Sequence, residues 1–111
     1  MKVNALTTED SVPQLGQIVK ILKGREKGQY AVVIKHLNDK FVLLADGDKR
    51  KYDRPKKKNI IHFEETPYIS SEVRKSLLET NRVSNGKLRF AIAKFASEVV
   101  TDLERGDNND V

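Results

Sequence analysis

Ten residues carry the whole positive charge excess of this chain. The sequence of 111 residues holds 21 Lys and Arg against 16 Asp and Glu, which gives a net charge of +5. Residues 49–58 contain seven cations and one carboxylate, whereas residues 1–48 have a net charge of +1 and residues 59–111 of −2. Seven cations this close together repel one another unless an anion is bound. The tract therefore favours an anionic partner over a general surface charge.

The sequence of this tract also allows other interpretations. Lysines on an edge strand prevent aggregation, and a run of like charges is often disordered. An edge strand needs only one or two charges, so we expect a binding role. Tyr52 either stacks on an unpaired base or packs on the barrel. The predicted contact residues of the tract are Lys49, Arg50, Lys51, Arg54, Lys56, Lys57 and Lys58.

A second group of cations lies in a short loop bracketed by glycines. Gly24 and Gly28 favour positive φ or a close backbone approach, since neither has a Cβ. Arg25 and Lys27 lie between them, and Lys23 precedes them. Backbone N–H groups and cations together suit a phosphate, although a solvated turn has a similar composition. We predict Lys23, Arg25 and Lys27 as contact residues on the same surface as the tract.

The residue types that catalysis needs are scarce. There is no cysteine, and His36 and His62 stand at no spacing that would group metal ligands. The carboxylate pair Glu64 and Glu65 falls in a predicted turn rather than a cleft. We therefore expect a non-enzymatic protein without a metal, a cofactor or a small-molecule substrate.

The chain has no predicted membrane or export segment. Its longest apolar runs, residues 30–34 and 41–45, are far shorter than the roughly 20 residues that span a bilayer. The N-terminus does not join a basic end to an apolar stretch of signal-peptide length. Together with the lack of cysteine, this predicts a cytoplasmic protein with no membrane partner.

The first two thirds of the chain are predicted to form short strands. Alternating apolar and β-branched residues indicate strands over 17–23, 29–35 and 41–45. Residues 49–58 are expected to form a short strand running into a basic loop, and residues 59–63 another strand. Short strands separated by turns indicate a small antiparallel barrel or sandwich.

Beyond residue 67 the hydrophobic period changes from two to about 3.6. The pattern predicts a helix over 72–81, capped by Ser70 or Ser71, and a second helix over 86–104. The second helix carries one apolar stripe, which either packs on the barrel or forms a surface for a partner protein. The stripe consists of Leu88, Ile92, Phe95, Val99 and Leu103.

Residues 18–44 resemble the KOW motif of ribosomal proteins and transcription elongation factors. The resemblance rests on the alternating apolar residues, the loop from Gly24 to Gly28 and the apolar strand that follows. Gly28 stands where the family keeps its most invariant glycine, and Ala31 departs from a second glycine found in many members. The continuation to His62 is similar to small bacterial relatives of the archaeal and eukaryotic large-subunit ribosomal KOW proteins. The resemblance implies an SH3-like β-barrel whose loops bind structured ribosomal RNA.

These patterns predict an α+β, mainly β protein: a small SH3-like barrel followed by two C-terminal helices. We expect a flexible arm over 1–14, the barrel over 15–66, a helical extension over 67–105 and a frayed tail over 106–111. The expected function is RNA binding, ribosomal RNA first, in a ribosome- or translation-associated role. Proteins of the ribosome or the transcription machinery are further expected partners. The alternative is an adaptor whose C-terminal helix binds a protein of the transcription or translation machinery.

Overall fold

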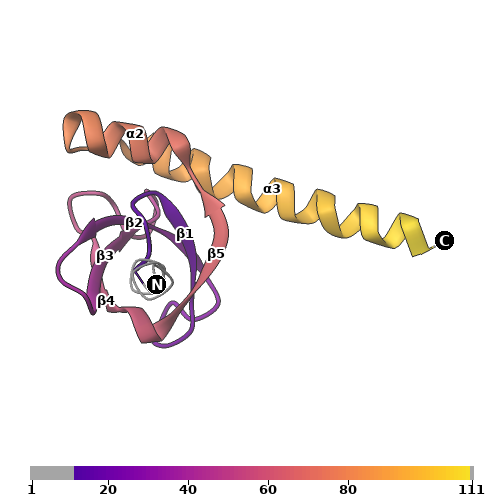
Figure 1. Cartoon of the computed structure of the whole chain (residues 1–111), viewed down its shortest axis with the longest axis horizontal. Coiled ribbons are helices and arrows are strands. Elements are labelled where there is room, and N and C mark those ends of the chain that lie inside the picture. Colours follow the sequence, from indigo (N-terminus) through magenta and orange to yellow (C-terminus); the bar gives the residue numbers. More distant parts are fainter. Residues whose placement is uncertain (1–11, 111) are drawn as a thin grey trace, which may run out of the picture.

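The computed structural model describes the backbone of residues 12–110 and the side chains of residues 12–99. A five-stranded sheet is followed by two α-helices, as Figure 1 shows. The predicted α+β class, mostly β with two C-terminal helices, is confirmed. The elements are β1 (Gln17–Ile21), β2 (Tyr30–His36), β3 (Phe41–Ala45), β4 (Lys56–Asn59), the 3-10 helix η1 (Ile60–His62), β5 (Phe63–Ile69), α2 (Ser71–Thr80) and α3 (Asn85–Asp110).

The sheet is antiparallel, with the strand order β4-β3-β2-β1-β5. The sheet bends so that one of its faces turns inward, and α2 and α3 lie together outside the bent sheet (Figure 1). No ladder joins β4 to β5 within residues 12–110, so the sheet is open rather than a closed barrel. The turn η1 links these two edges. There the Ile60 N–H donates to the Lys40 carbonyl, and the Leu22 N–H donates to the His62 carbonyl, each at 2.9 Å.

Alternating side chains give the sheet two buried faces. Val33 and Val42 belong to a core on the inside of the curl, whereas Val32 and Ile34 belong to a second core under the helices. The central strand β2 contributes to both cores, which explains the unbroken apolar run at its centre. The sheet therefore needs a cover on its outer face as well as its own curvature on the inner face.

The two helices supply that outer cover. Leu88 of α3 is completely buried, and Phe95 is 5% exposed. The Phe95 ring lies between Tyr30 and Tyr68, with centroids 4.8 and 5.0 Å away in tilted and edge-on arrangements. Burying a side chain of this size contributes roughly 1.5–3 kcal/mol to stability. The helices are thus part of the folded core.

The predicted apolar stripe of α3 packs on the sheet. Leu88 and Phe95 are core residues, and Ile92 and Val99 are partly buried against the same core. Leu103 lies outside the described side chains. Of the two interpretations of the stripe, packing within the chain therefore holds for its described members.

The helix boundaries follow capping chemistry. The Ser70 hydroxyl accepts a hydrogen bond from the Val73 N–H at 3.2 Å, so Ser70 is the cap of α2. The Ser84 hydroxyl accepts from the Lys87 N–H at 3.1 Å at the start of α3. α3 then continues through Gly106, where the sequence predicts a stop. A glycine inside a helix costs only about 1 kcal/mol relative to alanine, which does not by itself end a helix.

Residues 49–55 form a turn and loop instead of the predicted short strand, and β4 begins only at Lys56. The physical reason is the Asp46 carboxylate. One of its oxygens accepts hydrogen bonds from the backbone N–H groups of Asp48 at 2.8 Å and Arg50 at 2.9 Å. These N–H groups are used in a local turn and cannot enter a strand ladder.

The strand predicted over 59–63 is wrong for residues 60–62, which form η1; β5 begins only at Phe63 and passes through Pro67 to Ile69. Pro67 is tolerated because β5 is an edge strand and its register with β1 shifts there, so that Gln17 pairs with Ile69. At the other end of the chain, Pro13 is fully buried and the Gln14 N–H donates to the Gln17 side chain. Residues 12–14 of the predicted flexible arm therefore pack on the fold, and the rest of that arm lies outside the described residues.

Gly47 and Gly28 form a matched pair for testing how the β3–β4 loop meets α3. Their φ angles are +82° and +88°. A Cβ on Gly47 would collide with the Asn85 carbonyl oxygen, whereas a Cβ on Gly28 would meet nothing within 4 Å. Gly28→Ala should cost about 1–3 kcal/mol of unfolding free energy through backbone strain. Gly47→Ala should cost roughly 1–3 kcal/mol more through overpacking. Urea unfolding measures both free energies of unfolding. If the two variants lose the same stability, the close approach of Gly47 to the start of α3 is contradicted.

Candidate nucleic-acid interface

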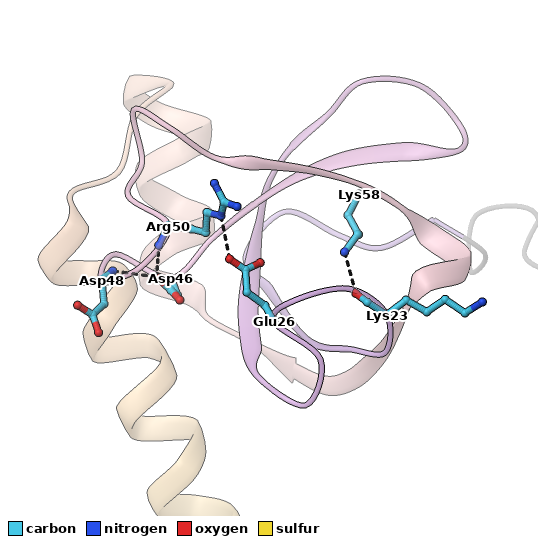
Figure 2. A network of polar contacts seen from close by, with 6 residues as sticks. All are labelled: Lys23, Glu26, Asp46, Asp48, Arg50 and Lys58. Carbon is cyan, nitrogen blue, oxygen red and sulfur yellow. Dashed lines mark hydrogen bonds and ion pairs between the residues drawn. The ribbon is translucent and has the colours of Figure 1, made fainter.

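The two predicted groups of cations lie in loops at one end of the sheet. The first is the β1–β2 loop, residues 22–29, and the second is the β3–β4 loop, residues 46–55. Both connect successive antiparallel strands and leave from the same end, because β1 and β3 both pair antiparallel with β2. Arg50 Nε donates to Glu26 Oε2 at 2.9 Å, which joins the loops directly (Figure 2).

The ion pair between Glu26 and Arg50 is half-shielded from water. The Arg50 side chain is 38% exposed and the Glu26 side chain 16%. Pairs near the surface contribute about 0–1 kcal/mol, so the main effect of this pair is to fix one loop against the other. Arg50, a predicted contact residue, already has an anionic partner within the chain.

Lys58 is in a position that does not suit the phosphate contact predicted for it. It is 9% exposed, and its Nζ donates to the Lys23 carbonyl oxygen at 2.9 Å (Figure 2). Its strand partner Val42 is completely buried. The Lys58 side chain therefore ties β4 to the β1–β2 loop, and the ammonium is occupied within the fold.

Most of the other predicted cations are exposed. Lys57 is exposed with its Nζ 4.7 Å from the centroid of the Phe41 ring, and Lys51 Nζ donates to the Asp48 carbonyl at 3.0 Å. Lys56 is half-buried. The exposed predicted cations are Lys23, Arg25, Lys27, Lys49, Lys51, Arg54 and Lys57.

The glycine-bracketed loop has the predicted positive φ angles, +99° at Gly24 and +88° at Gly28. Two of its backbone N–H groups donate hydrogen bonds within the chain. The Lys27 N–H donates to the Gly24 carbonyl at 3.2 Å, and the Gly28 N–H donates to the Ile21 carbonyl at 2.7 Å. These two N–H groups are therefore occupied within the chain, and the exposed side chains Arg25 and Lys27 carry the positive charge of this loop.

Tyr52 packs against the helices. Its N–H donates to Asn85 Oδ1 at 2.7 Å, and its hydroxyl donates to the Asn81 carbonyl at 3.0 Å. The ring also contacts the outer core. Tyr52 thus packs within the chain instead of standing free for a base, but its hydrogen bonds are to the helical end of the chain rather than to the predicted barrel.

Sequence reasoning missed a third group of cations, at the corner between α2 and α3. Arg89 Nη1 donates to the Gly47 carbonyl at 2.8 Å, and the Arg82 guanidinium lies 5.8 Å from the centroid of the Tyr52 ring. Residues 80–97 hold four Lys and Arg and no carboxylate, a signal lost when charges are summed over residues 59–111. Arg82, Lys87 and Arg89 lie at this corner, residues 81–89, whereas Lys94 lies further along α3.

The described part of the chain contains no group of three or more His, Cys, Asp or Glu that could hold a metal ion. None of the helices described is long and apolar enough to cross a membrane.

Comparison with known proteins gives one informative match. No protein-family model matches the chain. A curated protein of Bacillus subtilis (strain 168), described as "Putative ribosome-binding protein YbzG", is 52% identical over 44 residues. The match covers 40% of this chain and 60% of that protein. The chain is therefore similar to part of a protein whose name refers to the ribosome.

Lys58 and its neighbour Lys57 test the structural role of the buried ammonium. Lys58→Met keeps an unbranched side chain but removes the ammonium that donates a hydrogen bond to the Lys23 carbonyl oxygen. We expect a loss of about 1–3 kcal/mol of unfolding free energy. Lys57→Met loses only an exposed contact with an aromatic ring, worth about 0.5–1 kcal/mol. Urea unfolding compares the two, and a Lys58→Met protein as stable as the parent would rule the role out.

Proposed function

We propose that this chain is a non-enzymatic RNA-binding protein that associates with the ribosome through structured ribosomal RNA. The observation that carries the proposal is the junction of the β1–β2 and β3–β4 loops through Glu26 and Arg50. This junction gathers exposed cations from both loops at one end of the sheet, Arg25, Lys27 and Lys49 among them. RNA presents many spaced phosphates, so a set of spaced cations suits it better than it suits one small anion.

Two likenesses support the ribosome as the partner. The Bacillus subtilis relative carries ribosome binding in its name, and the KOW resemblance over residues 18–44 implies ribosomal RNA. The resembling segment spans β1 to β3, including the glycine-bracketed loop. We accordingly propose an SH3-like fold of the KOW type for the curled sheet, and a cytoplasmic location where ribosomes act.

Binding in this proposal is chiefly electrostatic. Lysine and arginine side chains on the loops contact phosphates and release the counterions condensed on the RNA. Such contacts position the RNA without reading its bases. Tyr52, the one aromatic side chain of the tract, is engaged with Asn81 and Asn85, so the loops offer little for base recognition. We therefore expect recognition of RNA shape with modest sequence specificity.

The adaptor hypothesis has less support. It assigns protein binding to the apolar stripe of α3, and Leu88 and Phe95 of that stripe are buried against the sheet. A partner could reach these residues only by displacing the outer core of the protein itself. RNA binding needs no such rearrangement, because its candidate residues are already exposed.

The salt dependence of RNA binding tests the electrostatic mechanism. With about 5–7 phosphates neutralised, log K for protein-free bacterial ribosomal RNA should fall with log salt at a slope of about −4 to −6. A triple variant, Arg25→Gln, Lys27→Gln and Lys49→Gln, should flatten that slope by about 2–3. Fluorescence anisotropy over a range of salt concentrations gives both slopes.

A control variant has the same net charge as the triple loop variant, but its substitutions lie at the other end of the sheet and on α2. It carries Lys35→Gln, Lys40→Gln and Lys75→Gln, all at exposed positions. This control should bind nearly as well as the parent chain, because only long-range attraction is lost. If the two triple variants lose the same affinity for RNA, net charge rather than the loop surface governs binding. A parent chain with a flat salt response would refute the mechanism.

Crosslinking in cells identifies the RNA. Reads concentrated at one site of ribosomal RNA are expected if the shape of one structured element is recognised. The triple loop variant should lose these reads while the control variant keeps them. Recovery of no RNA by the parent chain would instead favour the adaptor hypothesis.

A further inference from the structure

The corner between α2 and α3 lies against the β3–β4 loop and carries cations of its own. We infer that the RNA interface continues from this loop onto the corner, where Arg82 and Lys87 contact phosphates. The inference rests on the proposed RNA binding and extends it to a part of the chain outside the KOW resemblance. It gives the helical extension a direct part in binding, beyond covering the sheet.

The corner and the loop are held together as one unit. Tyr52 donates through its N–H to Asn85 Oδ1 at 2.7 Å and through its hydroxyl to the Asn81 carbonyl at 3.0 Å. Arg89 Nη1 donates to the Gly47 carbonyl at 2.8 Å, and Gly47 leaves no room for a Cβ against α3. These contacts fix the cations of the corner relative to Lys49 and its neighbours, so that one RNA surface can meet both.

Arg82 is presented by a backbone whose polar groups are satisfied. α2 ends at Thr80, and its C-cap residue Asn81 has a left-handed φ of 60°. The Arg82 N–H then donates to Thr80 Oγ1 at 3.3 Å. The Arg82 carbonyl accepts from Ser76 Oγ at 2.6 Å and from Thr80 Oγ1 at 3.1 Å. With Val83 buried next in sequence, the corner is preorganised and binding orders only the side chain.

The charges at the corner have no anionic partner among the described residues. Arg82 is exposed, and its guanidinium has only the Tyr52 ring at 5.8 Å beside it. Lys87 is exposed in the first turn of α3, which contains no acidic residue. A cation at a helix N-terminus opposes the helix dipole, so this arrangement is unfavourable until an anion binds. A phosphate placed between the corner and the loop removes that conflict.

A pair of substitutions at the corner tests the inference. The variant Arg82→Gln and Lys87→Gln should bind protein-free bacterial ribosomal RNA about tenfold more weakly at 0.1 M salt, with a salt slope flattened by about two. The charge-conserving variant Arg82→Lys and Lys87→Arg should restore most of the affinity. The exposed pair Lys35→Gln and Lys75→Gln is the matched control. Thermal unfolding of each variant separates weaker binding from weaker folding.

The outcomes distinguish this inference from the proposed function. Loss in the corner variant, with its recovery in the charge-conserving variant, supports the extended interface. If only the triple loop variant loses affinity for RNA, and the corner variant binds as tightly as its control, the extended interface is overturned and the proposed function stands. No effect of either variant on RNA binding overturns both. A corner variant that binds free RNA normally but no longer binds 70S ribosomes would overturn the phosphate contact and assign the corner to a ribosomal protein.

Discussion

The central strand β2 is buried on both faces, and this double burial dictates how the sheet and the helices pack. Val32 and Ile34 point into the outer core, and Val33 into the inner one. The curl of the sheet covers the inner face, and side chains of α2 and α3 complete the outer core (Figure 1). Leaving such side chains in water forfeits roughly 1.5–3 kcal/mol each, a large fraction of the stability of a small domain. The helical extension is therefore required by the sheet.

This requirement also shapes the charged end of the molecule. Once α3 packs through Leu88 and Phe95, its first turn is held against the β3–β4 loop. The loop then has two fixed neighbours: α3 through Tyr52, and the β1–β2 loop through the pair of Arg50 with Glu26. Cations from three distant parts of the sequence are therefore brought to one end of the sheet by the packing of α3 and by the ion pair of Arg50 with Glu26.

Local sequence signals predicted the elements well where one physical effect dominates. The apolar periods indicated β1 to β3 and both helices, and the hydroxyl of Ser70 marked the start of α2. The predictions were wrong where a side chain accepts hydrogen bonds from backbone N–H groups, and where an edge strand of the sheet accommodates a proline. The Asp46 carboxylate turned the expected strand at 49 into a loop. Pro67 did not end β5, because that strand lies at the edge of the sheet.

The location of the charge, the glycine-bracketed loop and the apolar stripe follow from residue type and spacing, so they are visible in the sequence. Which cations are available depends on how the chain packs. Lys58 and Arg50 belong to the same tract as Lys49, yet a carbonyl and a carboxylate distant in sequence occupy the first two. Packing also places Arg82 beside Tyr52, a proximity that no local pattern encodes. A charge depends on its residue alone, whereas its partner depends on how the whole chain packs.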